Sequence, residues 1–171
     1  MDVKLFRVIN LLSGRYLVID KLMILTSNKI KFVFFFILVF LLFRKRNVFI
    51  EAVVSIVITL FMHFITKLFY FKPRPFIDRR VRILTPSKFD SSFPSKHTLL
   101  TFAVSTIVFF YQRIAGSILL GFSVLTGLSR IWVGQHYPSD IAGSAVLGSF
   151  TSTIIHKLLK FQKENRADVK T

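Results

Sequence analysis

The chain carries the apolar run VFIEAVVSIVITLFMHFITKLFYF at residues 48–71. A helix of this length, rising about 1.5 Å per residue, crosses a hydrocarbon core of roughly 30 Å. Glu51, His63 and Lys67 interrupt the run but leave it predominantly apolar. The run therefore predicts a transmembrane helix.

Further apolar segments lie on both sides of this run and predict four more spans. They cover residues from about 24 to 43 before it, and residues 98–111, 114–133 and 137–159 after it. Residues 5–26 place apolar side chains at roughly helical spacing among charges, which is typical of a helix lying at the membrane interface. We predict an all-α, polytopic membrane bundle of about five transmembrane helices, with an interfacial helix over residues 1–23.

The composition favours a membrane protein with one domain over residues 1–171. The chain is 53% hydrophobic and has a formal net charge of +16. In a soluble protein this charge would suggest nucleic acid, but here the basic residues lie at the edges and gaps of apolar segments. Anionic lipid and the bilayer are therefore the expected partners. The absence of cysteine excludes disulfides, thiolate metal sites and a cysteine nucleophile.

Two polar segments connect the predicted spans at the same membrane surface. Counting crossings places the loop at residues 72–96 and the loop at residues 130–136 on one face. The polar tail, residues 160–171, lies on the other. Basic residues occur on both faces, so the positive-inside rule does not settle which face is outside.

Three cations, Lys67, Arg74 and Arg130, belong to these loops or to the helix ends beside them. Phosphoryl transfer spreads negative charge over three equatorial oxygens, so its catalyst needs several preorganised cationic donors. Arginine offers a planar fork for phosphate oxygens, and lysine acts as a point charge. The alternative is that all three are interfacial residues whose charged ends reach toward water.

Ser95, Lys96 and His97 stand immediately before an apolar helix. Ser95 or a neighbour can be the N-cap, which leaves backbone amides pointing out of the helix end as an anion site. His97 can then protonate a leaving oxygen. The competing interpretation is a capped helix beside a surface histidine.

His136 and Asp140 are four residues apart, and Pro138 between them suits the first position of a helix. Asp140 in the first turn can reach back to His136 and accept its Nδ1 proton. Nε2 would then be free to attack phosphorus. A helix-capping aspartate beside an interfacial histidine is the alternative.

A hydrolytic metal is the other chemistry that these side chains suggest. His97, His136 and Asp140 could be its ligands. The surrounding basic side chains would repel a divalent cation and already perform its charge-stabilising role. We therefore expect neither a metal nor another cofactor.

Together the motifs resemble those of the type 2 phosphatidic acid phosphatase superfamily. The family pattern is Lys-x6-Arg-Pro, then Pro-Ser-Gly-His, then Ser-Arg-x5-His-x3-Asp. The corresponding residues here are Lys67…Arg74-Pro75, Pro94-Ser95-Lys96-His97 and Ser129-Arg130…His136…Asp140. Lys96 replaces the glycine, and a lysine can still donate its backbone amide.

The resemblance implies roles for these residues. His136 would be the nucleophile that forms a phosphohistidine, His97 the proton donor, and Asp140 the residue that orients His136. Lys67, Arg74, Ser95, Lys96 and Arg130 would hold the phosphoryl group, without a metal.

Within the superfamily the chain is most similar to bacterial undecaprenyl-diphosphatases of the bacitracin-resistance type. The shared features are the short chain, the non-glycine residue at position 96 and the N-terminal Leu5-Phe6-Arg7…Ile9-Asn10…Asp20-Lys21-Leu22. This resemblance implies hydrolysis of undecaprenyl diphosphate in the bacterial cell membrane, with the active site facing outward. Phosphatidylglycerophosphate, phosphatidate or another lipid phosphate is the alternative substrate. A non-catalytic protein that binds anionic lipid through Arg79, Arg80 and Arg82 is the alternative from a different class.

Overall fold

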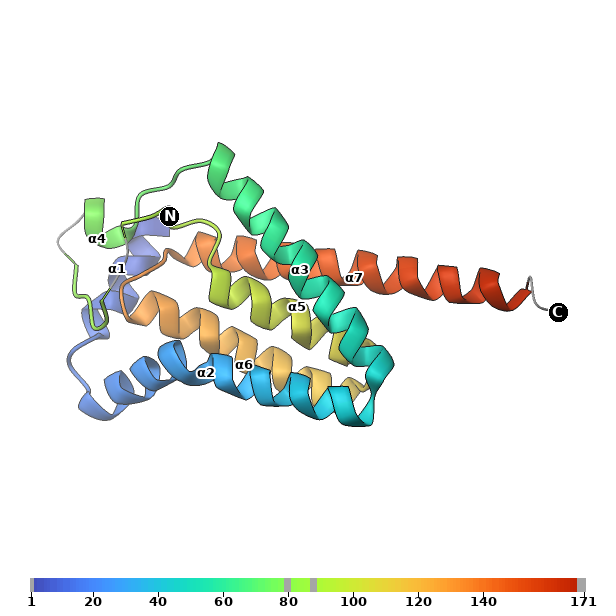
Figure 1. Ribbon diagram of the computed structural model, residues 1–171. Coiled ribbons are helices and arrows are strands. Elements are labelled where there is room, and N and C mark those ends of the chain that lie inside the picture. The colour runs from blue at the N-terminus through green and yellow to red at the C-terminus, as the bar shows by residue number, and fades with distance from the viewer. Residues whose placement is uncertain (1, 79–80, 87–88, 169–171) are drawn as a thin grey trace.

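The computed structural model describes residues 2–78, 81–86 and 89–168, and within these ranges it contains helices and no strand (Figure 1). Met1, Arg79, Arg80 and the end of the predicted tail, residues 169–171, lie outside them. The helices are α1 (Asp2–Leu12), α2 (Leu17–Arg44), α3 (Arg46–Phe69), α4 (Pro75–Asp78), α5 (Lys96–Tyr111), α6 (Arg113–Trp132) and α7 (Pro138–Asp168). The predicted all-helical fold is confirmed.

Helix α5 lies at the centre of the bundle, where it packs against α3, α6 and α7. Helix α2 packs against α3 and α6, and α1 lies against α6 and α7 at one end (Figure 1). Apolar side chains from α2, α3, α5 and α6 form one buried cluster. Its members are Ile30, Phe34, Leu41, Val48, Ala52, Val104, Ile107, Val108 and Leu119.

Small residues let α5 and α7 approach closely. A Cβ atom on Gly148 would lie 2.4 Å from the carbonyl oxygen of Leu99. Beside it, the Ser152 hydroxyl donates to the carbonyl oxygen of Ala103 at 3.0 Å. Inside a membrane such polar groups need partners within the protein, and short side chains supply them without separating the helices.

Three helices, α2, α3 and α6, are long and apolar enough to cross a membrane. Helix α5 is apolar but has only 16 residues, which corresponds to roughly 24 Å. Helix α7 is long, but its inward face carries Ser144, Ser149 and Ser152, which form hydrogen bonds within the bundle. These serines lower the hydropathy of α7, as do the charged residues of its last turns. All five predicted spans correspond to helices that lie side by side in the bundle.

The predicted N-terminal helix over residues 1–23 is wrong in its boundaries, because two helices share this segment. Helix α1 ends at Leu12, Gly14 has a φ of +77°, and α2 already begins at Leu17. The Asp20 carboxylate accepts hydrogen bonds from the Gly14 amide at 3.0 Å and from Trp132 Nε1 at 2.8 Å. These contacts fix the bend and attach the start of α2 to the end of α6.

Helix α7 continues through Asp168, so the described part of the polar tail is helical. Helix α5 ends at Tyr111 and α6 begins at Arg113, so Gln112 alone separates them. Pro138 is the first residue of α7, as its missing amide predicts. The long α7 projects beyond the rest of the bundle at its C-terminal end (Figure 1).

Candidate active site

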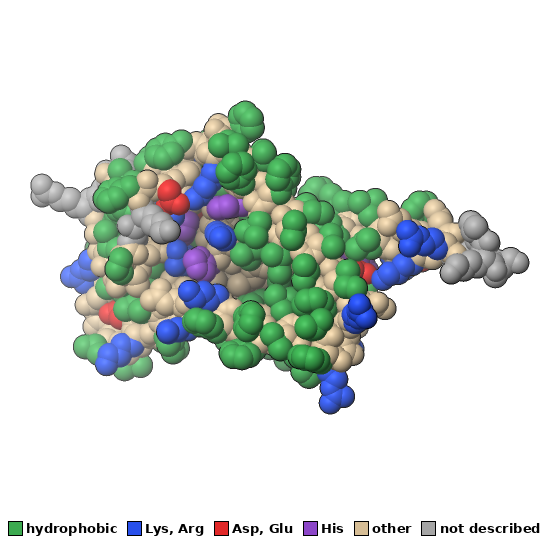
Figure 2. Space-filling view, viewed as in Figure 1, with side chains coloured by type: hydrophobic (Ala, Val, Ile, Leu, Met, Phe, Trp, Pro, Cys, Tyr) green, Lys and Arg blue, Asp and Glu red, His purple; other side chains and the backbone are tan. Residues whose placement is uncertain are grey.

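A cavity of about 790 Å³ opens where α3 and α6 end and α5 begins. In Figure 2 it is the hollow in which histidine, lysine and arginine side chains gather, bordered by hydrophobic side chains. The lining residues are Ser27, Asn28, Lys29, Lys31, Phe32, His63, Lys67, Arg74, Pro86, Asp90, Pro94, Lys96, His97, Arg130, Gln135 and His136. Six of the eight predicted site residues are in this set.

Lys67 and Arg74 meet at Asp90, which sequence reasoning missed. Lys67 Nζ lies 2.7 Å from Asp90 Oδ2, and Arg74 Nη2 lies 2.7 Å from Asp90 Oδ1. Burial alone would raise the pKa of Asp90, but its hydrogen bonds to Lys67 and Arg74 and their charges lower it overall. The Asp90 carboxylate thus forms ion pairs with both cations that were predicted to hold phosphate.

Arg130 reaches the cavity from the last turn of α6. Its Nη1 donates to the Ser27 hydroxyl on α2 at 2.8 Å. Its Nε is buried and has no hydrogen-bond partner among the residues that the structure describes. A buried donor without a partner costs about 1–3 kcal/mol. An anion bound in the cavity would accept the hydrogen bond that Arg130 Nε does not otherwise form.

His136 lies in the turn between α6 and α7 and is buried. Its Nδ1 is 2.7 Å from the backbone carbonyl oxygen of Ser92, and its Nε2 is 3.5 Å from Arg74 Nη1. Only a protonated Nδ1 can donate to a carbonyl, so the contact selects the tautomer with a free lone pair on Nε2. Burial, followed by the charges of Arg130 and Arg74, holds the pKa of His136 well below 6.5.

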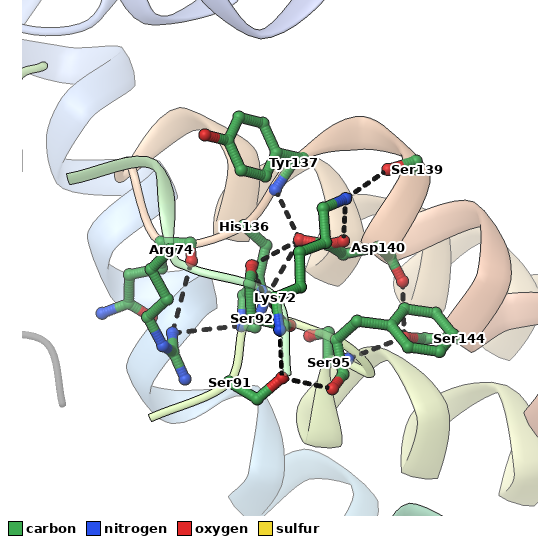
Figure 3. A network of polar contacts seen from close by, with 12 residues as sticks. Lys72, Arg74, Ser91, Ser92, Ser95, His136, Tyr137, Ser139, Asp140 and Ser144 are labelled. Atoms are coloured by element: carbon green, nitrogen blue, oxygen red, sulfur yellow. Dashed lines mark hydrogen bonds and ion pairs between the residues drawn. The ribbon is translucent and has the colours of Figure 1, made fainter. Parts of the chain in front are cut away.

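Asp140 is placed differently from the expectation that it accepts the Nδ1 proton. Its Oδ2 is 4.0 Å from His136 Nδ1, too far for a hydrogen bond. It instead accepts a short hydrogen bond from the Ser92 hydroxyl and another from the Tyr137 amide at 2.9 Å (Figure 3). Asp140 therefore holds Ser92, whose carbonyl in turn orients His136.

Lys72, which no motif indicated, completes this arrangement. Its Nζ is 2.6 Å from Asp140 Oδ1 (Figure 3) and 3.3 Å from Asp2 Oδ2. Burial by itself would lower the pKa of Lys72, but the hydrogen bonds and charges of Asp140 and Asp2 raise it overall. The buried Asp140 carboxylate is thereby paired with a stable cation, and α1 is tied to the site.

The residues at the start of α5 separate into two groups. Lys96 and His97 line the cavity. Ser95 is the N-cap, as predicted, and is fully buried. Its amide donates to the Ser144 hydroxyl at 2.7 Å, and its own hydroxyl accepts a hydrogen bond from the Thr98 hydroxyl at 3.1 Å. The contact between the Ser95 side chain and phosphate stays a prediction.

The chain resembles a known family along most of its length. A protein-family model described as the PAP2 superfamily matches residues 48–164. The chain belongs to the PAP2 superfamily. The matched region contains every residue that we predicted for the site.

Named members of the superfamily extend the comparison. The chain is 37% identical over 151 residues to the undecaprenyl-diphosphatase BcrC of Bacillus subtilis, covering 86% of this chain and 78% of that protein. It is 29% identical to the bacitracin transport permease protein BcrC of Bacillus licheniformis, covering 91% and 79%. The similarity to these two proteins thus covers most of the chain.

Two solved structures share its fold. LpxE of Aquifex aeolicus superimposes with a TM-score of 0.80 at 28% identity, covering 91% of this chain and 94% of that one. A transmembrane PAP2-type phosphatidylglycerolphosphate phosphatase of Bacillus subtilis gives a TM-score of 0.74 at 18% identity, covering 93% and 84%. The helical arrangement is thus that of membrane PAP2 phosphatases.

The alternative of a lipid-binding protein without activity depended on Arg79, Arg80 and Arg82. The first two lie outside the described residues. Arg82 Nη1 donates to the carbonyl oxygen of Ser13 at 2.8 Å, and its backbone amide and carbonyl bind the side chain of Asn10. Arg82 therefore attaches the loop to the N-terminal segment, and PAP2 membership favours an enzyme.

Proposed function

We propose that this protein hydrolyses undecaprenyl diphosphate to undecaprenyl phosphate and inorganic phosphate in the bacterial cell membrane, which recycles the carrier lipid of cell-wall synthesis. The observation that carries the proposal is the convergence of a neutral, oriented His136 with Lys67, Arg74 and Arg130 in one cavity. The 37% identity to an undecaprenyl-diphosphatase supports the choice of substrate.

In the first step, Nε2 of His136 attacks the terminal phosphorus and the bond from that phosphorus to the bridging oxygen breaks. Arg74 lies 3.5 Å from Nε2 and can hold an equatorial oxygen during the attack. Arg130 supplies a second guanidinium, whose Nε has no partner among the described residues. Preorganised cations stabilise the charge that develops on these oxygens.

The substrate phosphate has to displace the Asp90 carboxylate from Lys67 and Arg74. Lys67 and Arg74 hold the carboxylate until the phosphoryl group arrives. The exchange keeps both cations paired throughout, which avoids leaving a partly buried charge without a counterion.

His97 gives a proton to the leaving oxygen. Water then attacks the phosphohistidine, the bond between nitrogen and phosphorus breaks, and His97 takes the proton from that water. The products are inorganic phosphate and the free His136. Asp140 at 4.0 Å from Nδ1 stabilises the positive ring by charge, and the Ser92 carbonyl keeps it aligned.

The experiment is a phosphate-release assay with purified protein in EDTA. We expect turnover of undecaprenyl diphosphate, which would support metal-independent chemistry, and we expect His136→Ala to lose at least about a thousandfold in kcat. Turnover retained by that variant would overturn the mechanism. Phosphatidylglycerophosphate and phosphatidate in the same detergent test the alternative substrates. A higher kcat/KM for either one would overturn the assignment of the lipid.

A further inference from the structure

The cavity carries more positive charge than a single phosphoryl group requires. Among the residues that the structure describes, its lining contains one carboxylate, Asp90, and six cations. Asp90 pairs with Lys67 and Arg74, and Arg130 turns one of its nitrogens toward Ser27. The remaining cations are Lys29, Lys31 and Lys96.

These three lysines form no ion pair with any residue that the structure describes. The ammonium groups of Lys29 and Lys31 lie 5.5 and 5.3 Å from the centre of the Phe32 ring, and Lys96 is exposed to the cavity. Ionisable side chains within membrane helices are costly and mark substrate or ion pathways.

Lys31 has a defined position relative to the phosphoryl site. Ser27, which accepts the hydrogen bond from Arg130, lies four residues earlier on α2. Residues four apart share one face of a helix, so Lys31 follows Ser27 by one turn on the face toward the cavity. Since α2 runs from this end of the bundle toward the opposite end (Figure 1), Lys31 lies one turn farther from this end than Ser27.

Lys96 approaches the same region from α5. It is the first residue of that helix, where the backbone dipole also favours an anion. Lys31 and Lys96 come from different helices and line the same cavity as His97, the proposed proton donor to the leaving oxygen.

The leaving group determines what such a site would bind. When a diphosphate is cleaved, negative charge develops on the phosphate that stays with the lipid, whereas a phosphomonoester leaves an alcohol oxygen with no phosphate to hold. Cations placed there stabilise the transition state of the first reaction more than that of the second.

We propose that Lys31 and Lys96, with Lys29 at the edge, form a second phosphate subsite that binds the lipid-linked phosphate of a diphosphate substrate. The inference rests on the proposed function, because it assumes that the terminal phosphate lies between His136 and Arg130. It makes the enzyme selective for diphosphates over monophosphates with the same lipid tail.

The experiment compares farnesyl diphosphate with farnesyl phosphate, so that the tail is constant. We expect Lys31→Gln to lower the ratio of the two kcat/KM values, diphosphate over monophosphate, at least tenfold. Lys96→Gln should act in the same direction, and Lys31→Arg should keep most of the wild-type ratio because the charge is retained. Lys21→Gln is the matched control: Lys21 is an exposed lysine of α2 that does not line the cavity.

The outcomes separate this inference from the proposed function. A ratio that stays within twofold of wild type in Lys31→Gln, with circular dichroism unchanged, would overturn the subsite. If the wild-type protein cleaves neither prenyl substrate, the proposed function fails. In that case the ratio of the kcat/KM values for diacylglycerol diphosphate and phosphatidate tests the subsite. A ratio in Lys31→Gln within twofold of wild type would again overturn it.

Discussion

His136 is oriented by a backbone carbonyl, so no substitution of one side chain removes its orienting acceptor. Asp140 does not contact His136 by a hydrogen bond; it binds the hydroxyl of Ser92, whose carbonyl oxygen accepts from His136. Lys72 neutralises the charge of Asp140. The spacing of a sequence motif does not predict that one residue acts through the backbone of another. The spacing of His136 and Asp140 predicted that they would be neighbours but not which atoms would bind.

The first prediction concerns the protonation of His136. Burial and the charges of Arg130 and Arg74 hold its pKa well below 6.5. The ring therefore stays neutral and nucleophilic as the pH falls from 8 through 6.5, and it protonates only at lower pH. NMR of histidine-labelled protein, with the signal assigned by His136→Asn, should show a neutral ring at pH 6.5. A half-protonated His136 at that pH would contradict the prediction.

Asp90 provides the second prediction at this scale. In Asp90→Asn, Lys67 and Arg74 lose the carboxylate with which phosphate has to compete. Inorganic phosphate should therefore inhibit this variant with a Ki lowered roughly tenfold, which corresponds to about 1.4 kcal/mol. The control is Glu164→Gln, since Glu164 is an exposed residue paired only loosely with Lys160 at 3.9 Å. An unchanged or higher Ki in Asp90→Asn would show that Asp90 supports the cations instead of competing for them.

At the scale of elements, the site depends on how closely α5 approaches α7. Helix α5 carries Lys96 and His97, and α7 carries Asp140. The two helices meet through Gly148, and Ser144 binds the N-cap of α5. Packing in the middle of the bundle therefore sets the distance between the two halves of the proposed catalytic site.

Gly148→Ala tests this dependence. The added Cβ would lie 2.4 Å from the Leu99 carbonyl oxygen, so the helices must move apart. We expect a loss of stability of about 1–3 kcal/mol, measured by thermal unfolding in detergent, together with a lower kcat. Gly121→Ala is the control, because its Cβ would meet nothing within 4 Å. Equal stability of the two variants would contradict the prediction.

At the scale of the whole molecule, the bundle has polar clusters at both ends. The active-site end carries the cavity. At the other end the buried Glu51 pairs with His156 at 2.9 Å and with Lys163 at 3.1 Å. This second cluster joins the start of α3 to the late turns of α7, so it stabilises the bundle without contacting the site.

The orientation of these ends is the fourth prediction. The natural chain has no cysteine, so single cysteines report topology without background labelling. We expect a membrane-impermeant maleimide to label Ile83→Cys, an exposed position in the active-site loop, on intact cells. Lys45→Cys, in the turn between α2 and α3, should react only after permeabilisation. The reverse pattern would place the active site in the cytoplasm.

The sequence was sufficient for the class of fold because hydropathy acts locally. Apolar runs such as residues 48–71 bury themselves in lipid whatever their neighbours are, and Pro138 begins a helix for reasons that lie within the chain itself. The boundary of the N-terminal helix could not be predicted in this way. It depends on Asp20 meeting Trp132, which lies 112 residues away in the chain.

For the site, the motif spacings predicted six of the residues that line the cavity and left their partners open. Asp90 between two cations, Lys72 on Asp140, and the Ser92 carbonyl on His136 were decided only by tertiary structure. The physical reason is that Asp90, Lys72 and Ser92 belong to the segment between α3 and α5 and contact residues that are 16 to 68 positions away in the chain. Hydrogen bonds and ion pairs act over about 3 Å, and only the folded bundle brings these groups within that distance.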